Sequence, residues 1–188
     1  HGGDIRGIIQ RLDYIKELGY RTIFATSFLY NGHHEFHGYC VSNHLRVDPS
    51  FGSLEDFQEL TREAHKRGMY VVMDLVVNHV CGPGISYTSA PEYETCTSGM
   101  RGLEDSGDRS VATILGVSGR GEIGFSGDFF PALRRPEYFS ACGHDGAKMG
   151  NNEANEVYGD FATSMFDLNT GNRDVLHLIS SFAKYWIA

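Results

Sequence analysis

The sequence lacks any apolar run of about 18 residues, so no ordinary membrane-spanning helix is expected. It also lacks an excess of basic side chains. The net charge of -8 and a pI near 5.5 argue against a nucleic-acid partner, which would need a basic face. There is no Asn-x-Ser/Thr acceptor, no CxxC pair and no G-x-S-x-G turn, so glycosylation, thiol metal sites and serine hydrolase chemistry have no support. We therefore expect neither a nucleic-acid nor a membrane partner.

The chain begins at His1 without an initiator Met or a signal-like apolar segment, and we expect it to be an internal piece of a longer protein. The chain has four cysteines, Cys40, Cys81, Cys96 and Cys142. This even number permits disulfides with three possible connectivities, and the sequence neither requires disulfides nor distinguishes the connectivities.

Apolar spacing predicts alternating helices and strands. Residues 5–18 have the period of an amphipathic helix, and Gly19 follows as a C-terminal stop. The β-branched and aromatic run over 21–28 predicts a strand. The polar, His-rich stretch over 30–49 has no clean period, and we interpret it as a loop after that strand.

The pattern then repeats. Ser53 and Asp56 resemble a capping box that starts a second helix. Residues 70–80, YVVMDLVVNHV, form a continuous apolar run typical of a parallel strand buried on both faces. A right-handed crossover places the ends of both strands at one edge of the sheet, where ligands of α/β folds bind. We therefore expect the His-rich loop to meet Asn78 and His79.

The rest of the chain departs from this rhythm. Residues 81–165 are rich in Gly and Ser without a helical period, which indicates an inserted subdomain with short β-like runs such as 111–117. A helix capped by Asn172 then follows. The predicted class is α/β, with regular parts at 1–80 and 166–188 around the insertion.

Two motifs have weaker interpretations. Residues 119–124 match G-x-G-x-x-G, but they lie inside the irregular insertion and precede no helix, so we favour a loop over a dinucleotide site. Residues 33–37 read HHEFH, and a zinc site there is less favoured than a polar binding loop because the H-E-x-x-H spacing is missing.

Asp74 interrupts the apolar run of the second strand. A buried carboxylate is costly unless it is paired, so we expect a cationic partner nearby. Asn78 and His79 alone could simply satisfy backbone groups at a strand end. The carboxylate in the same strand favours a functional interpretation of all three side chains.

Four segments together resemble the α-amylase family of glycoside hydrolases. Residues 74–79, DLVVNH, are similar to its D-x-x-x-N-H segment, and residues 37–39 and 47–52 are similar to family sequence before it. Residues 166–169, FDLN, resemble its P-D-L-N/D segment, with Phe166 in place of the usual Pro. The resemblance covers nearly the whole chain. It implies the first half of a (β/α)8 TIM barrel with an irregular domain B insertion.

The resemblance also implies roles. His37 and Tyr39 match positions that line the sugar subsite next to the scissile bond, where Tyr39 stacks on the pyranose. His79 resembles the histidine that hydrogen-bonds the same sugar. Asp74 resembles a structural aspartate that orients an arginine further along the chain. Cys40 stands where many relatives carry an aromatic residue, which leaves the sugar contacts outside the central subsite open.

The resemblance implies calcium as the cofactor. Asn78 and Asp167 match positions that ligate a structural calcium between barrel and insertion, and oxygen donors suit this hard cation. A third oxygen ligand is expected from the insertion, but the sequence does not distinguish Glu153, Glu156 and Asp160.

The implied activity is cleavage of α-glucosidic bonds in starch-like glucans or oligosaccharides by a retaining mechanism, which needs a carboxylate nucleophile and a carboxylic acid. The family places these carboxylates after the next strand. We therefore expect no catalytic residue within this chain and no activity from the chain alone. A transglycosylase or glucan synthase-associated domain of the same family is the alternative, as is a non-catalytic sugar-binding homologue. The sugar-binding and calcium positions present together argue against a non-enzymatic member of the family such as the heavy chain of an amino-acid transporter. They leave open a sugar-binding homologue without catalysis, whose missing half would be degenerate.

Overall fold

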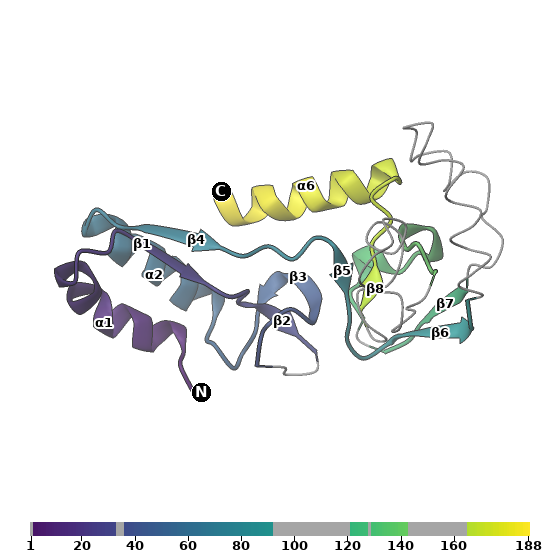
Figure 1. The fold of residues 1–188 in the computed structure, drawn as a ribbon, viewed down its shortest axis with the longest axis horizontal. Coiled ribbons are helices and arrows are strands. Elements are labelled where there is room, and N and C mark those ends of the chain that lie inside the picture. Colours follow the sequence, from purple (N-terminus) through teal and green to yellow (C-terminus); the bar gives the residue numbers. More distant parts are fainter. Residues whose placement is uncertain (1, 33–35, 92–120, 128, 143–164) are drawn as a thin grey trace, which may run out of the picture. The chain divides into compact units, whose positions relative to one another are not determined.

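The computed structural model describes residues 2–32, 36–91, 121–127, 129–142 and 165–188 (Figure 1). The chain divides into two compact units, residues 1–76 and 77–188, and each is described by itself. The domain boundaries expected after residues 80 and 165 stay a prediction. Large parts of the predicted insertion, including the β-like run at 111–117, lie outside the described residues.

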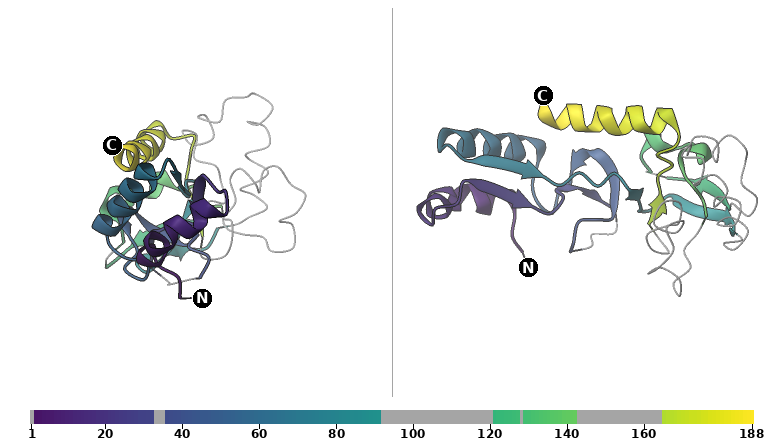
Figure 2. Two further views of the ribbon diagram at one scale, coloured as in Figure 1. Left: turned by 90° about the vertical axis from the view of Figure 1, so that its left-hand side faces the viewer. Right: turned by 45° about the horizontal axis from the view of Figure 1, so that its top comes forward.

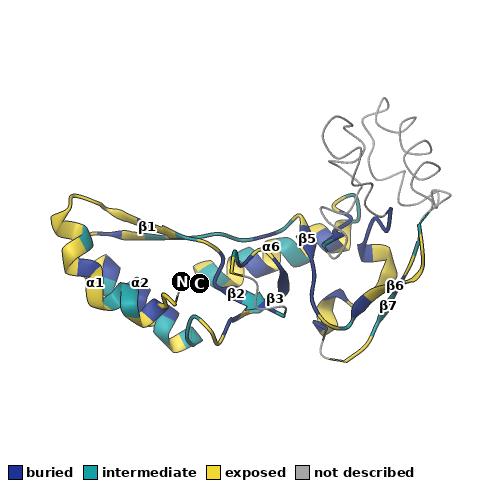
Figure 3. Ribbon diagram, turned by 60° about the horizontal axis from the view of Figure 1, so that its bottom comes forward, coloured by how far each residue is buried: buried dark blue, intermediate teal, exposed yellow. Residues whose placement is uncertain are grey.

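The first unit is built on two parallel strands with two helices on one side (Figure 3). Strands β1 (Thr22–Ala25) and β4 (Tyr70–Met73) pair in register. Helices α1 (Ile5–Glu17) and α2 (Leu54–Lys66) pack side by side, as the purple and blue helices of Figure 2 show. Ile23 of β1 is buried. These four elements follow one another in the predicted helix, strand, helix, strand order, and two further strands lie between β1 and α2.

Side-chain caps start both helices. The Asp4 carboxylate accepts the Gly7 N–H at 2.6 Å at the start of α1. At α2 the Ser53 hydroxyl accepts the Asp56 N–H, and the Asp56 carboxylate accepts the Ser53 N–H. This reciprocal arrangement is the capping box predicted from the sequence, and it satisfies N–H groups that have no partner within the helix.

The second strand is shorter and more exposed than predicted. Strand β4 ends at Met73, whereas we expected it to reach Val80. Tyr70 is 68% exposed and Val72 is 44% exposed, so the expectation of a strand buried on both faces is wrong for this structure. The physical reason for this exposure is that the strand pair is covered on one face only. Within the described residues β4 has β1 as its one strand partner, and the helices of the unit cover one face of the pair.

The segment predicted as a loop over 30–49 contains a β-hairpin. Strands β2 (Leu29–Asn31) and β3 (Val41–Val47) pair antiparallel, with register shifts in β2. Strand β3 buries polar side chains, among them Ser42 and His44, on its inner side. Their polarity hid the alternation of buried and exposed positions from the sequence analysis. The loop is therefore confined to the residues between β2 and β3.

The second unit contains two small antiparallel pairs. Strand β5 (His79–Val80) pairs with β8 (Phe166–Asp167), and β6 (Ile85–Ser89) pairs with β7 (Glu122–Phe125). The chain thus leaves the first unit and immediately enters β5. Its partner β8 comes from almost ninety positions later in the sequence, so this contact is long-range.

Strand β7 explains the glycines of the G-x-G-x-x-G match. Among the described residues, the next helical element after β7 is a three-residue 3₁₀ turn and not an α-helix, so the context of a dinucleotide site is missing, although part of the predicted loop is a strand. A Cβ atom on Gly121 would lie 2.6 Å from the Ser89 carbonyl oxygen, and one on Gly124 would lie 2.5 Å from the Thr88 side chain. These glycines therefore permit the close approach of β7 to β6.

Two 3₁₀ turns, η1 (Pro131–Leu133) and η2 (Pro136–Tyr138), precede the final helix α6 (Arg173–Ile187). The Asn172 side chain caps α6 by accepting the Asp174 N–H, which confirms the predicted cap. No helix among the described residues is long and apolar enough to cross a membrane.

The sequence left the state of the cysteines open. Cys40, Cys81 and Cys142 are each disulfide-bonded and buried. No free thiol occurs in the part of the chain that the structure describes.

Candidate functional site

His37 and Tyr39 lie together at the end of the β2–β3 loop. The Tyr39 N–H donates to Nδ1 of His37 at 3.0 Å, and the two rings stack with centroids 5.7 Å apart and planes at 18°. The exposed ring of Phe36 lies against His37 in a T-shaped arrangement, with ring centroids 5.3 Å apart. Tyr39 is 39% exposed, so the pair offers aromatic surface to a ligand. Aromatic faces of this kind bury the apolar C–H face of a ligand efficiently.

Gly38 allows this pair of rings to form. Its φ of 75° lies in the left-handed region, which L side chains rarely adopt. A Cβ atom there would lie 2.7 Å from the carbonyl oxygen of buried Ser27. The loop therefore rests on the backbone after β1, with His37 and Tyr39 on either side of the contact. Ser27 was not among the residues predicted to take part in this arrangement.

Asp48 anchors the same hairpin. One of its carboxylate oxygens accepts the Asn31 N–H at 2.9 Å, and the other accepts the Ser50 N–H at 2.8 Å. The carboxylate is buried and links the end of β2 to the turn after β3. From the sequence, Asp48 was predicted only as part of a family segment. An Asp between a strand and a Pro-Ser turn was the signal that could have shown this anchoring role.

The structure corrects the expectation for Asp74. This residue follows the end of β4 and is half-buried, so the predicted buried carboxylate is wrong. A half-exposed carboxylate keeps part of its hydration, which removes the need for an adjacent cation. No ion pair among the described residues includes Asp74. Its role in orienting an arginine stays a prediction.

The second unit brings Asn78, His79 and Asp167 together. His79 and Asp167 are partners in the β5–β8 ladder, and the Leu168 N–H donates to the Asn78 carbonyl at 2.9 Å. The Asn78 side-chain amide lies 3.2 Å from Nδ1 of His79. If the amide nitrogen is the donor, the neutral imidazole carries its proton on Nε2. Asn78 is exposed, whereas His79 and Asp167 are buried.

A third segment lies on the other side of β8. Phe139 forms an isolated bridge with Leu168, and the Asn169 N–H donates to the Tyr138 carbonyl. Ser140 Oγ donates to Asp167 Oδ2 at 2.5 Å. Asp167 therefore lies between β5 and this segment. Ser140 was not among the predicted site residues, because nothing in a single sequence reveals a pairing across 27 positions.

The donor types of Asn78 and Asp167 fit calcium, which takes six to eight oxygen ligands. The strand pairing places both residues near the β5–β8 edge. No group of three or more His, Cys, Asp or Glu side chains suited to a metal occurs among the described residues. Further ligands would have to come from elsewhere, and the candidates Glu153, Glu156 and Asp160 lie outside the described residues. His33, His34 and Glu35 of the HHEFH stretch also lie outside the described residues.

The expected residues thus form two groups. His37 and Tyr39 belong to the first unit, and Asn78, His79 and Asp167 to the second. The expected meeting of the His-rich loop with Asn78 and His79 joins the two units and stays a prediction.

Several curated proteins resemble this chain over part of its length. The probable oligo-1,6-glucosidase 2 of Bacillus subtilis is 48% identical over 77 residues, which is 41% of this chain and 14% of that protein. The trehalose-6-phosphate hydrolase of Escherichia coli is 44% identical over 77 residues, with the same shares of 41% and 14%. These matches cover less than half of this chain and only a small share of each relative.

Solved structures match over almost the whole chain. An α-amylase from Geobacillus thermoleovorans, complexed with acarbose, superposes with a TM-score of 0.63 at 27% identity. The match covers 99% of this chain and 32% of that one. The trehalose-6-phosphate hydrolase of Bacillus licheniformis gives a TM-score of 0.55 at 28% identity, over 98% of this chain and 29% of that one. The chain therefore spans about a third of the length of these enzymes.

A family model described as "Alpha amylase, catalytic domain" matches residues 1–188, which is the whole chain. The mixed α/β fold and the four sequence segments agree with this match. The chain belongs to the α-amylase catalytic-domain family of glycoside hydrolases.

Proposed function

We propose that the intact protein hydrolyses α-glucosidic bonds in starch-like glucans or oligosaccharides with retention of anomeric configuration, and that this chain supplies side chains that bind the sugar. The observation that carries the proposal is the ring pair of His37 and Tyr39, held by Gly38 in a chain of this family. The named activities of the curated relatives, an oligo-1,6-glucosidase and a trehalose-6-phosphate hydrolase, support an α-glucoside as substrate.

The chemistry divides between binding and bond cleavage. The ring of Tyr39 covers one face of the pyranose, while His37 and His79 donate or accept hydrogen bonds with its hydroxyl groups. Bond cleavage with retention needs two carboxyl groups about 5 to 5.5 Å apart, one a nucleophile and one an acid and base. We assign neither to residues 1–188, so the chain prepares the sugar for groups supplied by the remainder of the protein.

We also propose a (β/α)8 architecture, in which residues 1–80 and 166–188 belong to the barrel and residues 81–165 to an inserted domain B. The parallel β1–β4 pair with its connecting helix supports this proposal, because it is the unit from which such barrels are built. The TM-score of 0.63 with an α-amylase supports it as well.

Calcium is the proposed cofactor, with Asn78 and Asp167 as two of its ligands. The amide and carboxylate oxygens are suitable donors for a hard cation. When bound, the ion would cross-link the chain segments that ligate it and balance the charge of Asp167. The role is structural, and no step of bond cleavage passes through it.

The experiment uses the intact protein with maltooligosaccharides, isomaltose and trehalose 6-phosphate as substrates. We expect hydrolysis of at least one, with the α-anomer as the first product detected by NMR. Tyr39→Ala should lower kcat/KM at least tenfold. Tyr14→Ala, which removes an exposed tyrosine of α1, is the matched control and should leave activity unchanged. If elongated chains are the main product, the activity is transglycosylation and not hydrolysis. If the protein is inactive but binds sugar, its role is sugar binding.

A further inference from the structure

His44 is a fully buried histidine of strand β3 that bonds to the backbone of a distant segment. Its Nε2 lies 2.7 Å from the carbonyl oxygen of Val76, 32 positions along the chain. A carbonyl oxygen can only accept, so Nε2 carries the proton and donates. Val76 is itself buried and lies beyond the end of β4, where the β1–β4 ladder has stopped. The bond from His44 satisfies a carbonyl that the ladder does not reach.

This bond joins two parts of the chain that matter for the proposed site. Strand β3 follows directly on the loop that carries His37 and Tyr39. Val76 lies between Asp74 and Asn78 in sequence, on the segment that leads into β5. The hydrogen bond of the imidazole therefore connects the hairpin that carries His37 and Tyr39 to the segment that leads into β5.

We propose that His44 is a positioning residue, which fixes the backbone at Val76 relative to the β2–β3 hairpin and thereby the geometry of the sugar-binding side chains. The inference rests on the proposed function for its effect on catalysis. His44 acts through the backbone and is not placed in contact with the sugar.

The side chain is specific for this task. A donor must reach the Val76 carbonyl from β3 across a packed interior, and the ring fills the space on the way. His44→Phe keeps a flat ring but removes the donor, which leaves a buried carbonyl without its hydrogen bond. His44→Gln retains an N–H donor at a similar reach. Comparison of the two variants separates the hydrogen bond from the filling of space.

The test uses His44→Phe and His44→Gln in the intact protein. A buried leucine of α2 serves as the stability control, Leu60→Val or Leu60→Ala, whichever matches the Tm loss of His44→Phe more closely. All are assayed well below their Tm values. A small displacement of binding groups can lower a rate about a hundredfold, so we expect His44→Phe to lower kcat/KM by about 10- to 100-fold. His44→Gln should recover most of the loss, and the Leu60 variant should stay within about twofold.

Hydrogen exchange gives a readout that does not depend on activity. Amides of residues 74–80 should exchange faster in His44→Phe than in the Leu60 variant of equal Tm. If His44→Phe does not fold, His44→Asn takes its place, because its amide is one methylene shorter than that of Gln. Equal exchange and equal kcat/KM in the His44 and Leu60 variants would overturn the proposal. An inactive wild-type protein with faster exchange only in the His44 variant would refute the proposed function and leave the positioning role standing.

Discussion

Ser140 binds Asp167 through both its side chain and its backbone. Its Oγ–H donates to the Asp167 carboxylate at 2.5 Å, and its N–H donates to the Asp167 carbonyl at 3.1 Å. Both residues are buried. The carboxylate proposed as a calcium ligand is thus held on the chain by a hydroxyl group from a neighbouring segment.

Ser140→Ala should therefore destabilise the protein. A hydrogen bond to a charged group contributes about 1.5 to 3 kcal/mol, and the variant should lose an amount in this range in urea unfolding. Ser180→Ala is the control, because the Ser180 hydroxyl donates to the Leu176 carbonyl on the exposed surface of α6. The control should change stability by less than about 0.5 kcal/mol. Equal losses in both variants would contradict a special role for Ser140.

Ala141, the next residue, has a φ of 55°. The left-handed conformation costs a residue with a Cβ atom roughly 1 to 2 kcal/mol. Gly avoids this cost, but it loses more conformational entropy on folding, which offsets part of the gain. We expect Ala141→Gly to stabilise the protein by up to about 1 kcal/mol. The reciprocal change is Gly127→Ala, at φ 57° with no atom within 4 Å of the new Cβ, and it should destabilise by about 1 kcal/mol. Changes of the same sign in both variants would be inconsistent with this account.

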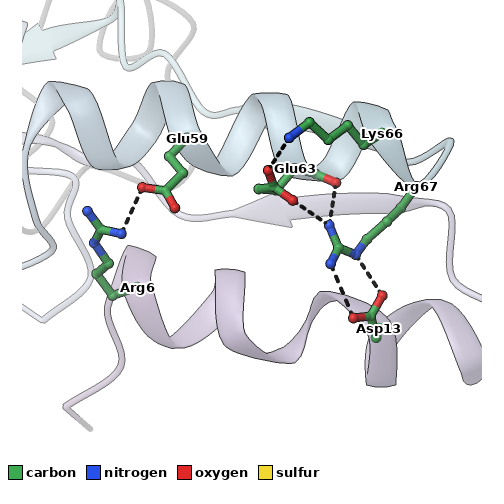
Figure 4. Close-up of polar contacts among 6 residues, drawn as sticks. All are labelled: Arg6, Asp13, Glu59, Glu63, Lys66 and Arg67. Carbon is green, nitrogen blue, oxygen red and sulfur yellow. Dashed lines mark hydrogen bonds and ion pairs between the residues drawn. The ribbon is translucent and has the colours of Figure 1, made fainter.

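Charged side chains connect α1 and α2 at the surface (Figure 4). Arg67 donates to both carboxylate oxygens of Asp13, at 2.7 and 3.1 Å, and to Glu63 at 2.8 Å. The hydrogen bond from Arg67 lowers the pKa of Asp13, and hydrogen bonds from Lys66 and then Arg67 lower the pKa of Glu63. In the folded state both carboxylates thus hold their protons less tightly than in the unfolded chain.

This arrangement predicts the direction of the pH dependence. A carboxyl group with a lowered folded-state pKa stabilises the fold above its unfolded pKa of about 4, and the contribution is lost as pH falls through the folded value. The contribution of these two carboxylates to Tm should therefore be constant near neutral pH and be lost below about pH 4. Arg67→Gln should raise the pKa of Asp13, measured by NMR titration. Arg11→Gln, on the same helix as Asp13, should leave it unchanged, and a constant Asp13 pKa in both variants would contradict the contact.

Removal of calcium tests the proposed ligands. A ligand bound only to the folded state stabilises it by about 2.7 kcal/mol at a concentration one hundred times its Kd. Chelation should therefore lower the Tm of the intact protein. In Asn78→Ala, chelation should lower the Tm by much less than in the wild type. In Asn31→Ala, which changes an amide in the first unit, chelation should lower the Tm as much as in the wild type. Identical melting curves of the wild type with and without chelator would count against Asn78 and Asp167 as ligands.

The sequence predicted the elements whose signals are local. The helices α1, α2 and α6 and their caps at Ser53 and Asn172 depend on spacings of two to four residues, which a single sequence displays directly. Strand β3 was missed because its inner side carries Ser42 and His44. Burial of polar groups depends on partners elsewhere in the fold.

The predicted site residues show the same limit. The proximity of Asn78 and His79 to each other follows from their adjacency, whereas their pairing with Asp167 depends on a ladder between distant segments. The family resemblance placed Asp167 in the site, but neither pattern nor resemblance indicated Ser140. Asp74 was expected to be buried because its strand was read as longer than it is, and a ladder ends where its partner strand ends.

The contact of Gly38 with Ser27 has a consequence for enzyme engineering. Saturation mutagenesis at position 38 would meet a backbone atom at 2.7 Å and a left-handed φ, so nearly every substitution there should be lost from a library for reasons of folding. Phe36, 85% exposed two positions earlier, has room for any side chain. A search for altered substrate range should randomise Phe36 and keep Gly38 constant.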